Sequence, residues 1–427
     1  MNHTILEAKV RDGYQTAREI YAAYGVDTDQ VLDQLAGVQI SLHCWQGDDV
    51  GGFEAGAGEL SGGGILATGN YPGKARNGEE LRQDLGTALG LIPGKHRVNL
   101  HASYAETGGD FVERDQLTID LFQNWLAWAE GQGIGLDFNP TFFSHPKAAA
   151  GFTLSSRDPA IRSFWIRHAQ CCREIAARMG ARLGSPCVNN IWVPDGSKDL
   201  PADRLVHRQL LKESLDEILA VSYDRAQLVD AVESKLFGIG SESYVVGSHE
   251  FYMGYGLSRQ IAICLDMGHF HPTESIADKL SALLLFAPHL LLHVSRGVRW
   301  DSDHVVILND DLIALAHEIK RCDAWNRISL ALDFFDASIN RISAWVIGAR
   351  ATLKALLYAM LEPTDRLAAE EARGNLGNRL ALLEELKTLP FGAVWHQYCL
   401  TQNVPVGTAW LDHVAAYERD VLAKRGR

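Results

Sequence analysis

The sequence predicts an α/β fold, a (β/α)8 TIM barrel with N-terminal helices and a C-terminal helical extension. Two observations predict it: eight short apolar runs alternate with helical segments, and the last four runs each end in a residue that can bind a metal. Such runs are typical of buried parallel strands, and eight strand–helix units are the number that closes a barrel. An open, doubly wound sheet is the alternative, but it rarely needs active groups on so many strands.

The first half of the chain supplies four of these units. Helices are expected within residues 5–35, where Asp27-Thr28-Asp29 is a helix start signal. The expected strands are 38–43, 97–101, 134–140 and 187–192, and the helices that follow them are 79–91, 119–132, 159–179 and 203–220.

The second half supplies four more units and the extension. The expected strands are 228–233, 261–266, 290–293 and 329–333, with helices near Ser258 and at 274–286 and 310–321 between them. Four helical segments follow Asp333, at 338–360, 365–387, 390–400 and 407–424. We therefore expect a catalytic barrel domain over 1–345, including the N-terminal helices. The remainder, 346–427, is expected to be a helical extension used for oligomerisation.

Composition excludes several classes of protein. The formal net charge of -13 argues against a nucleic-acid partner, which normally demands a basic face. No apolar run is long enough to span a bilayer, and the first residues have neither the basic region nor the apolar core of a secretory signal. The seven cysteines include no CxxC pair, which is typical of a reducing compartment. We expect a cytoplasmic protein with no membrane partner.

A long glycine-rich stretch, 51–74, follows the first expected strand. Long loops without secondary structure are usually lids or binding loops, and a disordered surface insert is the alternative. The apolar residues Phe53, Leu60, Ile65 and Leu66 favour a lid that packs on something. The stretch lacks the glycine spacing of a phosphate-binding loop.

Four metal-binding side chains end four successive strands: Glu233, Asp266, His293 and Asp333. Because parallel strands of a barrel finish at the same edge, these groups converge in space. Singly, each has a plainer interpretation as a helix cap or a buried hydrogen-bonding group. Those interpretations do not explain why four strands in a row end this way.

A second metal is indicated by His269, Asp301 and Asp303, with Asp266 able to bridge the two ions. Asp301 and Asp303 could instead be solvated loop charges. Mostly oxygen ligands with one or two imidazoles suit Mn²⁺, Mg²⁺ or Co²⁺ better than a thiolate zinc site.

Further candidates face the same edge. Lys235 lies two residues after Glu233 and could hold a substrate carbonyl oxygen as negative charge develops on it. His101 and Trp192 end the second and fourth strands. A tryptophan suits the apolar face of a sugar, although a role in the core is about as common. Asp137 and Asn139 are weaker candidates.

Long motifs then carry a resemblance to bacterial L-rhamnose isomerases, and more widely to xylose isomerase. The segments that carry it include HCWQGDDV at 43–50, NIWVPDG at 190–196, DMGHFHP at 266–272 and LDFFDASINR at 332–341. Segments 67–77, 232–240 and 293–304 match as well, so that the resemblance covers nearly the whole chain.

The resemblance implies a cytoplasmic, homotetrameric aldose–ketose isomerase that interconverts L-rhamnose and L-rhamnulose by a metal-assisted hydride shift. It implies a structural divalent metal such as Mn²⁺, Zn²⁺, Co²⁺ or Mg²⁺ and a catalytic Mn²⁺. The structural ion would be held by Glu233, Asp266, His293 and Asp333, and the catalytic ion by His269, Asp301 and Asp303. Lys235, Asp303 and His101 are the expected catalytic residues.

The methyl end of the sugar is expected to lie against an apolar wall. Besides Trp192, the candidates for this wall are Val50, Leu60, Ile65, Tyr104 and Phe335. Ser103 stands where a larger apolar residue is expected beside the methyl group. A metal-dependent hydrolase on the same barrel and a sugar-binding protein with inert metals are the two alternative functions.

Overall fold

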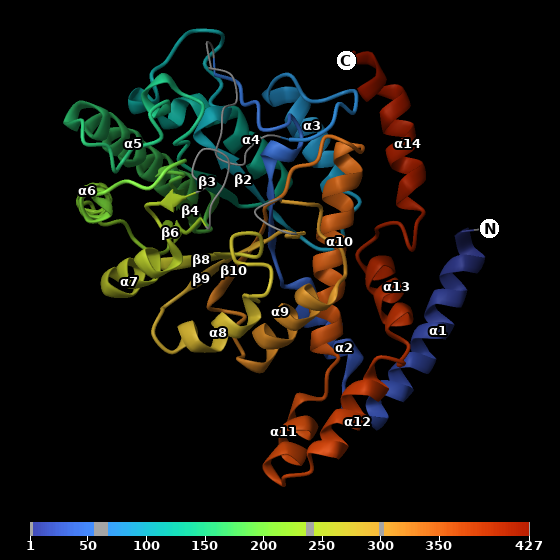
Figure 1. Ribbon diagram of the computed structural model, residues 1–427. Helices are drawn as coiled ribbons and strands as arrows, with labels where there is room; N and C mark the ends of the chain where they lie inside the picture. The colour runs from blue at the N-terminus through green and yellow to red at the C-terminus, as the bar shows by residue number, and fades with distance from the viewer. Residues whose placement is uncertain (1–2, 55–66, 236–242, 299–302, 427) are drawn as a thin grey trace.

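A closed barrel of eight parallel strands forms the centre of the protein, as a computed structural model shows over residues 3–54, 67–235, 243–298 and 303–426 (Figure 1). Each strand pairs with its neighbours in chain order, and the last pairs with the first. The strands are β1 (Ile40–His43), β2 (Arg97–His101), β3 (Leu136–Asn139), β4 (Cys187–Trp192), β6 (Leu228–Glu233), β8 (Ala262–Asp266), β9 (Leu290–Val294) and β10 (Ile328–Leu332). The predicted fold class and strand positions are confirmed.

Helices follow the strands and surround them (Figure 1). They are α3 (Gly78–Leu89), α4 (Gln123–Gln132), α5 (Pro159–Leu183), α6 (Arg204–Ile218), α7 (His249–Arg259), α8 (Ala277–Leu284), α9 (Asp310–Arg321) and α10 (Arg341–Met360). The side chain of Asn340 begins α10 by accepting hydrogen bonds from the amides of Ile342 and Ser343. Because α10 follows β10 and packs on α9 and α3, it occupies the place of the eighth barrel helix. It also runs continuously across the expected boundary between residues 345 and 346.

The middle of the barrel is lined by small and medium side chains. Val188, Ala231, Ala262, Cys264, Leu291 and Ala331 form one buried cluster there. The main core lies outside this layer, between the strands and the helices. Small residues in the middle leave the polar groups at the carboxyl ends of the strands to form a separate layer above them.

The remaining helices lie to one side of the barrel. They are α1 (His3–Ala23), α2 (Thr28–Ala36), α11 (Thr364–Ala372), α12 (Leu376–Leu386), α13 (Phe391–Thr401) and α14 (Trp410–Asp420). Figure 1 shows α1 beside α13, and α11 and α12 projecting from the lower end. The prediction of one helix over 365–387 is wrong. Gly374 separates α11 from α12 because its φ of +76° ends the first helix in the left-handed conformation.

A short antiparallel pair, β5 (Gly196–Ser197) and β7 (Tyr244–Val245), lies outside the barrel and was not predicted. Among the described residues no single helix has the length and apolarity needed to cross a membrane. Helices α10 and α11, which meet at a 50° bend, meet that criterion only as a pair.

Candidate metal centre and active site

The four predicted ligands of the structural ion lie together at the carboxyl ends of adjacent strands. Glu233 ends β6, Asp266 ends β8, His293 lies in β9, and Asp333 follows β10. His293 Nδ1 is 3.3 Å from Glu233 Oε1, 3.6 Å from Asp266 Oδ2 and 3.1 Å from Asp333 Oδ2. The first three of these four atoms are buried and form no hydrogen bond. Buried polar atoms that converge in this way fit a shared cation.

The charges of this cluster favour a cation as well. Burial raises the pKa of Asp333, and the neighbouring carboxylates add to that effect against the opposing influence of His293. Burial alone would lower the pKa of His293, but Cys264, Glu233 and the two aspartates raise it overall, well above the usual value. An imidazole that faces three carboxylates attracts a proton, and the same field attracts a divalent ion.

A second group of possible ligands lies beside the first. One atom each from Asp266, His269 and Asp303 falls within 4.8 Å of the others, so Asp266 belongs to both groups. His269 Nδ1 is 3.1 Å from Glu233 Oε1, so a ligand of the first group also contacts a ligand of the second. The third predicted ligand of the catalytic ion, Asp301, lies outside the described residues.

Neighbouring side chains orient these ligands. Trp45 Nε1 donates a hydrogen bond to Asp333 Oδ1 at 3.1 Å, and Asn190 Nδ2 donates one to Glu233 Oε2. Ser295 Oγ donates to Asp266 Oδ1 at 2.8 Å. These three orienting residues were missed in the sequence. Trp45 lies two residues after the end of β1, which was an available signal. The inward direction of Asn190 within β4 could be known only from the strand register.

Both groups open into one cavity of about 500 Å³, a volume that includes the solvent at its mouth. His101, Trp192, Lys235, Val50 and Phe335 line the cavity, together with Trp45, Asn139, Phe143 and Asn190. The cavity therefore brings the proposed ligands and most of the proposed substrate contacts to one place.

Lys235 and Trp192 are in direct contact in this cavity. The ammonium nitrogen of Lys235 lies 4.8 Å from the centre of the Trp192 ring, a cation–π distance. The ring of Trp192 also stacks on that of His269, with ring centres 6.4 Å apart. The lysine is 2% exposed, so its charge acts in a site from which water is largely excluded.

His101 ends β2 and lines the same cavity. Burial lowers the pKa of its imidazole to about 3, so the ring is neutral at physiological pH. Its Nδ1 is 3.2 Å from Thr141 Oγ1, and its ring centre is 4.8 Å from that of Trp45. A neutral, fixed imidazole can accept or donate one hydrogen bond to a bound polar group.

Some predicted residues lie elsewhere. Tyr104 is buried behind the cavity, where its hydroxyl donates to Asp48 Oδ1 at 2.7 Å. Asp137 pairs with Arg97 at 2.8 Å towards the other end of the barrel. Leu60 and Ile65 lie outside the described residues, as do residues 55–66 of the glycine-rich stretch proposed as a lid.

Comparison with known proteins decides the family. A family model described as L-rhamnose isomerase (RhaA) matches residues 8–425. The chain is 58% identical over 416 residues to the L-rhamnose isomerase of Rhodopirellula baltica, covering 97% of both proteins. It is 57% identical over 420 residues to that of Salmonella paratyphi A, covering 98% of this chain and all of the relative.

The chain belongs to the L-rhamnose isomerase family. As a member of this family it is an isomerase of the aldose–ketose class. Among solved structures, it is similar to D-psicose 3-epimerase from Clostridium cellulolyticum H10, at 15% identity and a TM-score of 0.44, over 67% of this chain and 95% of the other. An L-ribulose 3-epimerase gives 13% identity and a TM-score of 0.45, over 78% and 97%.

Proposed function

We propose that this protein interconverts L-rhamnose and L-rhamnulose by a hydride shift between C1 and C2 of the open-chain sugar. The observation that carries the proposal is the pair of ligand groups that share Asp266 and face one cavity with Lys235. The names of the relatives, at 56–58% identity over nearly the whole chain, support the choice of sugar. No redox cofactor takes part, because the hydride stays within one sugar molecule.

Two divalent ions fit the residues present. Glu233, Asp266, His293 and Asp333 would hold a structural ion such as Mn²⁺, Zn²⁺, Co²⁺ or Mg²⁺. The unpartnered buried atoms of the first three support this assignment. His269, Asp301 and Asp303, with Asp266, would hold a catalytic Mn²⁺, since carboxylates with one imidazole suit such a metal. When bound, the ions would polarise the C1 and C2 oxygens of the sugar and make a nearby water more acidic.

The chain's own catalytic residues have separate tasks. Lys235 holds the C1 oxygen while negative charge builds on it, an interaction that strengthens in the transition state. Asp303 orients the water that moves the hydroxyl proton. His101, neutral because it is buried, hydrogen-bonds the open-chain sugar and fixes its position.

The sugar's carbon skeleton would rest on an apolar wall. Trp192 covers its flat face, and Val50 and Phe335 contact the methyl end. Tyr104 supports this wall from behind through its hydrogen bond to Asp48. Burying one methyl group contributes about 0.8 kcal/mol, so the preference over a hydroxymethyl sugar is modest unless polar groups are also left unpaired.

We further propose that the protein is a cytoplasmic homotetramer that uses the extension after residue 345 for assembly. The seven cysteines are all free thiols, which suits a reducing compartment. The exposed leucines of α12, Leu376 and Leu380, support a contact with another copy, because large exposed apolar groups mark association surfaces.

An assay of ketose formation tests the proposal. The metal-stripped protein is incubated with L-rhamnose, with and without Mn²⁺, and then with a panel of aldoses. We expect L-rhamnulose only when a divalent ion is supplied, with L-rhamnose the best substrate. Release of phosphate from phosphodiesters without ketose formation would point to a hydrolase, and sugar binding without turnover would point to a binding protein.

A further inference from the structure

We infer that the C-terminal tail, residues 417–426, positions the cavity wall at Val50 by way of Arg341. The inference rests on the proposed isomerase site, since it assigns these residues a part in substrate binding there. It follows from an unbroken set of contacts that runs from the last residues of the chain to the edge of the cavity.

At the cavity, these contacts end at the strained backbone of Val50. Val50 and its neighbour Asp49 both have left-handed φ values, 63° and 59°. Aspartate tolerates that conformation, but a β-branched residue adopts it only when its surroundings impose it. Val50 is 7% exposed and lines the cavity. The conformation therefore aims the side chain at the position of the substrate.

Arg341 is the group that imposes this conformation. Its guanidinium forms a bidentate pair with the Asp49 carboxylate, at 2.8 Å and 2.7 Å. The remaining nitrogen donates to the carbonyls of Tyr71 and Pro72, at 2.8 Å and 3.3 Å. Arg341 is 4% exposed, and a buried bidentate pair holds its partner firmly. Arg341 thus ties the loop at residue 49 to the segment at residues 71 and 72.

That segment depends in turn on the C-terminal tail. The Tyr71 hydroxyl donates to the carboxylate of Glu418 at 2.9 Å, and the Gly73 amide donates to the carbonyl of Gly426 at 3.3 Å. Gly73 has a φ of +83°, and a side chain there would meet Leu422 at 2.7 Å. The tail and this segment are therefore in backbone contact, which only glycine permits.

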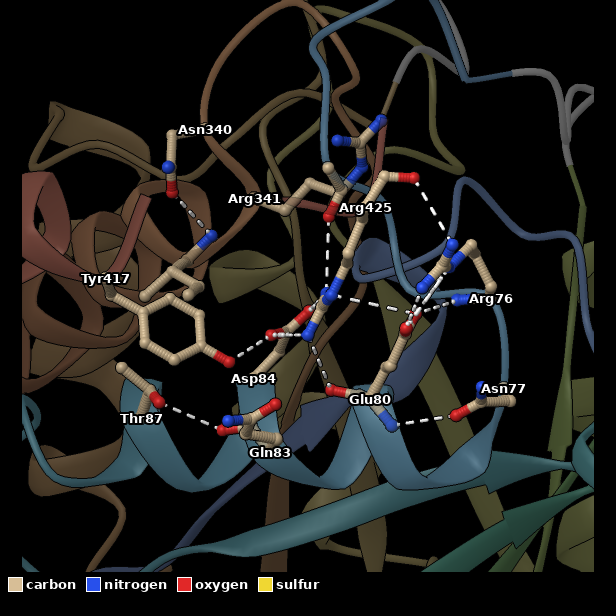
Figure 2. Close-up of polar contacts among 12 residues, drawn as sticks. Arg76, Asn77, Glu80, Gln83, Asp84, Thr87, Asn340, Arg341, Tyr417 and Arg425 are labelled. Atoms are coloured by element: carbon tan, nitrogen blue, oxygen red, sulfur yellow. Dashed lines mark hydrogen bonds and ion pairs between the residues drawn. The ribbon is translucent and has the colours of Figure 1, made fainter. Parts of the chain in front are cut away.

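Arg425 anchors the tail to α3. Figure 2 shows its guanidinium above that helix, bonded to the carboxylate of Asp84 at 2.6 Å and 2.9 Å. The hydroxyl of Tyr417 donates to the same carboxylate at 2.6 Å. Arg76 donates to the carbonyl of Arg425 and pairs with Glu80, closing the cluster. Burial raises the pKa of Asp84, and Arg425 opposes that effect. Loss of Arg425 would leave a buried carboxylate without its charged partner.

The test uses one variant at each end of the set, Arg425→Met and Arg341→Lys, and Arg419→Met as the matched control. Arg419 is exposed in the same tail and pairs only with its neighbour Asp420 among the contacts that the structure describes. For each of the two test variants we expect KM for L-rhamnose to rise about tenfold while kcat changes by less than about twofold, the pattern of a lost binding interaction. Arg419→Met should behave as the wild type.

The double variant shows whether the two arginines act through one path. If they do, Arg341→Lys combined with Arg425→Met should raise KM no more than the larger single change, because effects within one network are not additive. If the KM increases of the two single variants multiply in the double variant, the inference is overturned. Hydrogen exchange gives a readout independent of turnover: amides at 47–53 should exchange faster in both single variants. Unchanged exchange there would also overturn it.

Two further variants keep the test decisive. Should Arg425→Met fail to fold, Glu418→Ala removes the hydrogen bonds from Tyr71 and Asn340 while leaving Asp84 paired. It should give the same rise in KM and the same faster exchange. Arg341→Gln should raise KM more than Arg341→Lys does, because glutamine carries no charge to pair with Asp49. If the wild type makes no L-rhamnulose, the proposed function has failed. If the wild type is active and the variants match it, only the positioning role has failed.

Discussion

Trp45 Nε1 donates a hydrogen bond to Asp333 Oδ1 at 3.1 Å, and this bond joins the end of the first barrel strand to the end of the last. The two residues are 288 positions apart in the chain and meet only because β1 pairs with β10. The same indole contacts the ring of His101 edge to face. Trp45 therefore connects a proposed metal ligand to a proposed substrate contact.

Trp45→Phe should weaken binding of the structural ion about 10–100-fold, the usual effect of removing a group that orients a metal ligand. Calorimetric titration of metal-stripped protein with Mn²⁺ measures the change. Trp128→Phe, on α4 outside the barrel, serves as the control. Equal metal affinity in the wild type, Trp45→Phe and Trp128→Phe would show that the hydrogen bond from Trp45 does not orient Asp333.

Asp266→Asn should weaken binding of both ions and abolish turnover, because Asp266 belongs to both ligand groups. Its Oδ1 accepts hydrogen bonds from Ser295 and from the Gly268 amide, so Oδ2 is the atom that faces the ions. Metal analysis after dialysis gives the ions bound per chain, with the exposed Asp278→Asn on α8 as the control. Two full equivalents and normal activity would rule out a shared ligand.

Lys235→Met should leave both metals bound and lower turnover about 10²–10³-fold, the usual loss when a donor to developing charge is removed. Methionine keeps an apolar contact with Trp192. Asp303→Asn should instead lower turnover and metal affinity together, and excess Mn²⁺ should restore only part of the activity. Steady-state kinetics with metal analysis separates the two roles. Loss of metal from Lys235→Met would contradict the assignment.

Asp48 should make stability depend on pH. Burial raises the pKa of its carboxyl from the usual value of 3.8 to about 7. Between these two pH values the folded protein therefore keeps a proton that the unfolded chain releases. Its contribution to the free energy of unfolding is therefore largest below about pH 4 and falls by about 1.4 kcal/mol per pH unit up to about pH 7.

Asp48→Asn removes that dependence. Relative to the wild type, the variant should become steadily more stable as the pH rises from 5 to 7, and urea unfolding at several pH values measures the difference. Asp12→Asn, at an exposed position of α1, should show no such trend. A stability difference that does not change with pH would show that Asp48 is already ionised in the folded protein.

The barrel and its ligand cluster were predictable from the sequence because both follow from strand periodicity. Parallel strands end at one edge, so Glu233, Asp266, His293 and Asp333 had to converge once the strands were recognised. The split at Gly374 was not predicted, since a single glycine within an amphipathic pattern does not by itself end a helix.

Other features of the site needed three-dimensional information. Whether Tyr104 faces the cavity or lies behind it depends on the turn after β2, and no periodicity fixes that turn. The bond between Asn190 and Glu233 depends on the pairing of β4 with β6. The link from Arg425 to Val50 joins residues from opposite ends of the chain, which no local pattern in the sequence brings together.

The most direct test of the central claim uses L-rhamnose labelled with deuterium at C2. The Mn²⁺-loaded protein converts it in ordinary water, and NMR locates the label in the product. We predict L-rhamnulose that retains deuterium at C1, because the hydride moves within one molecule. Extensive loss of the label to water would contradict the hydride shift and point to proton abstraction by a base, with His101 the first residue to test. Formation of no ketose at all would contradict the proposed function itself.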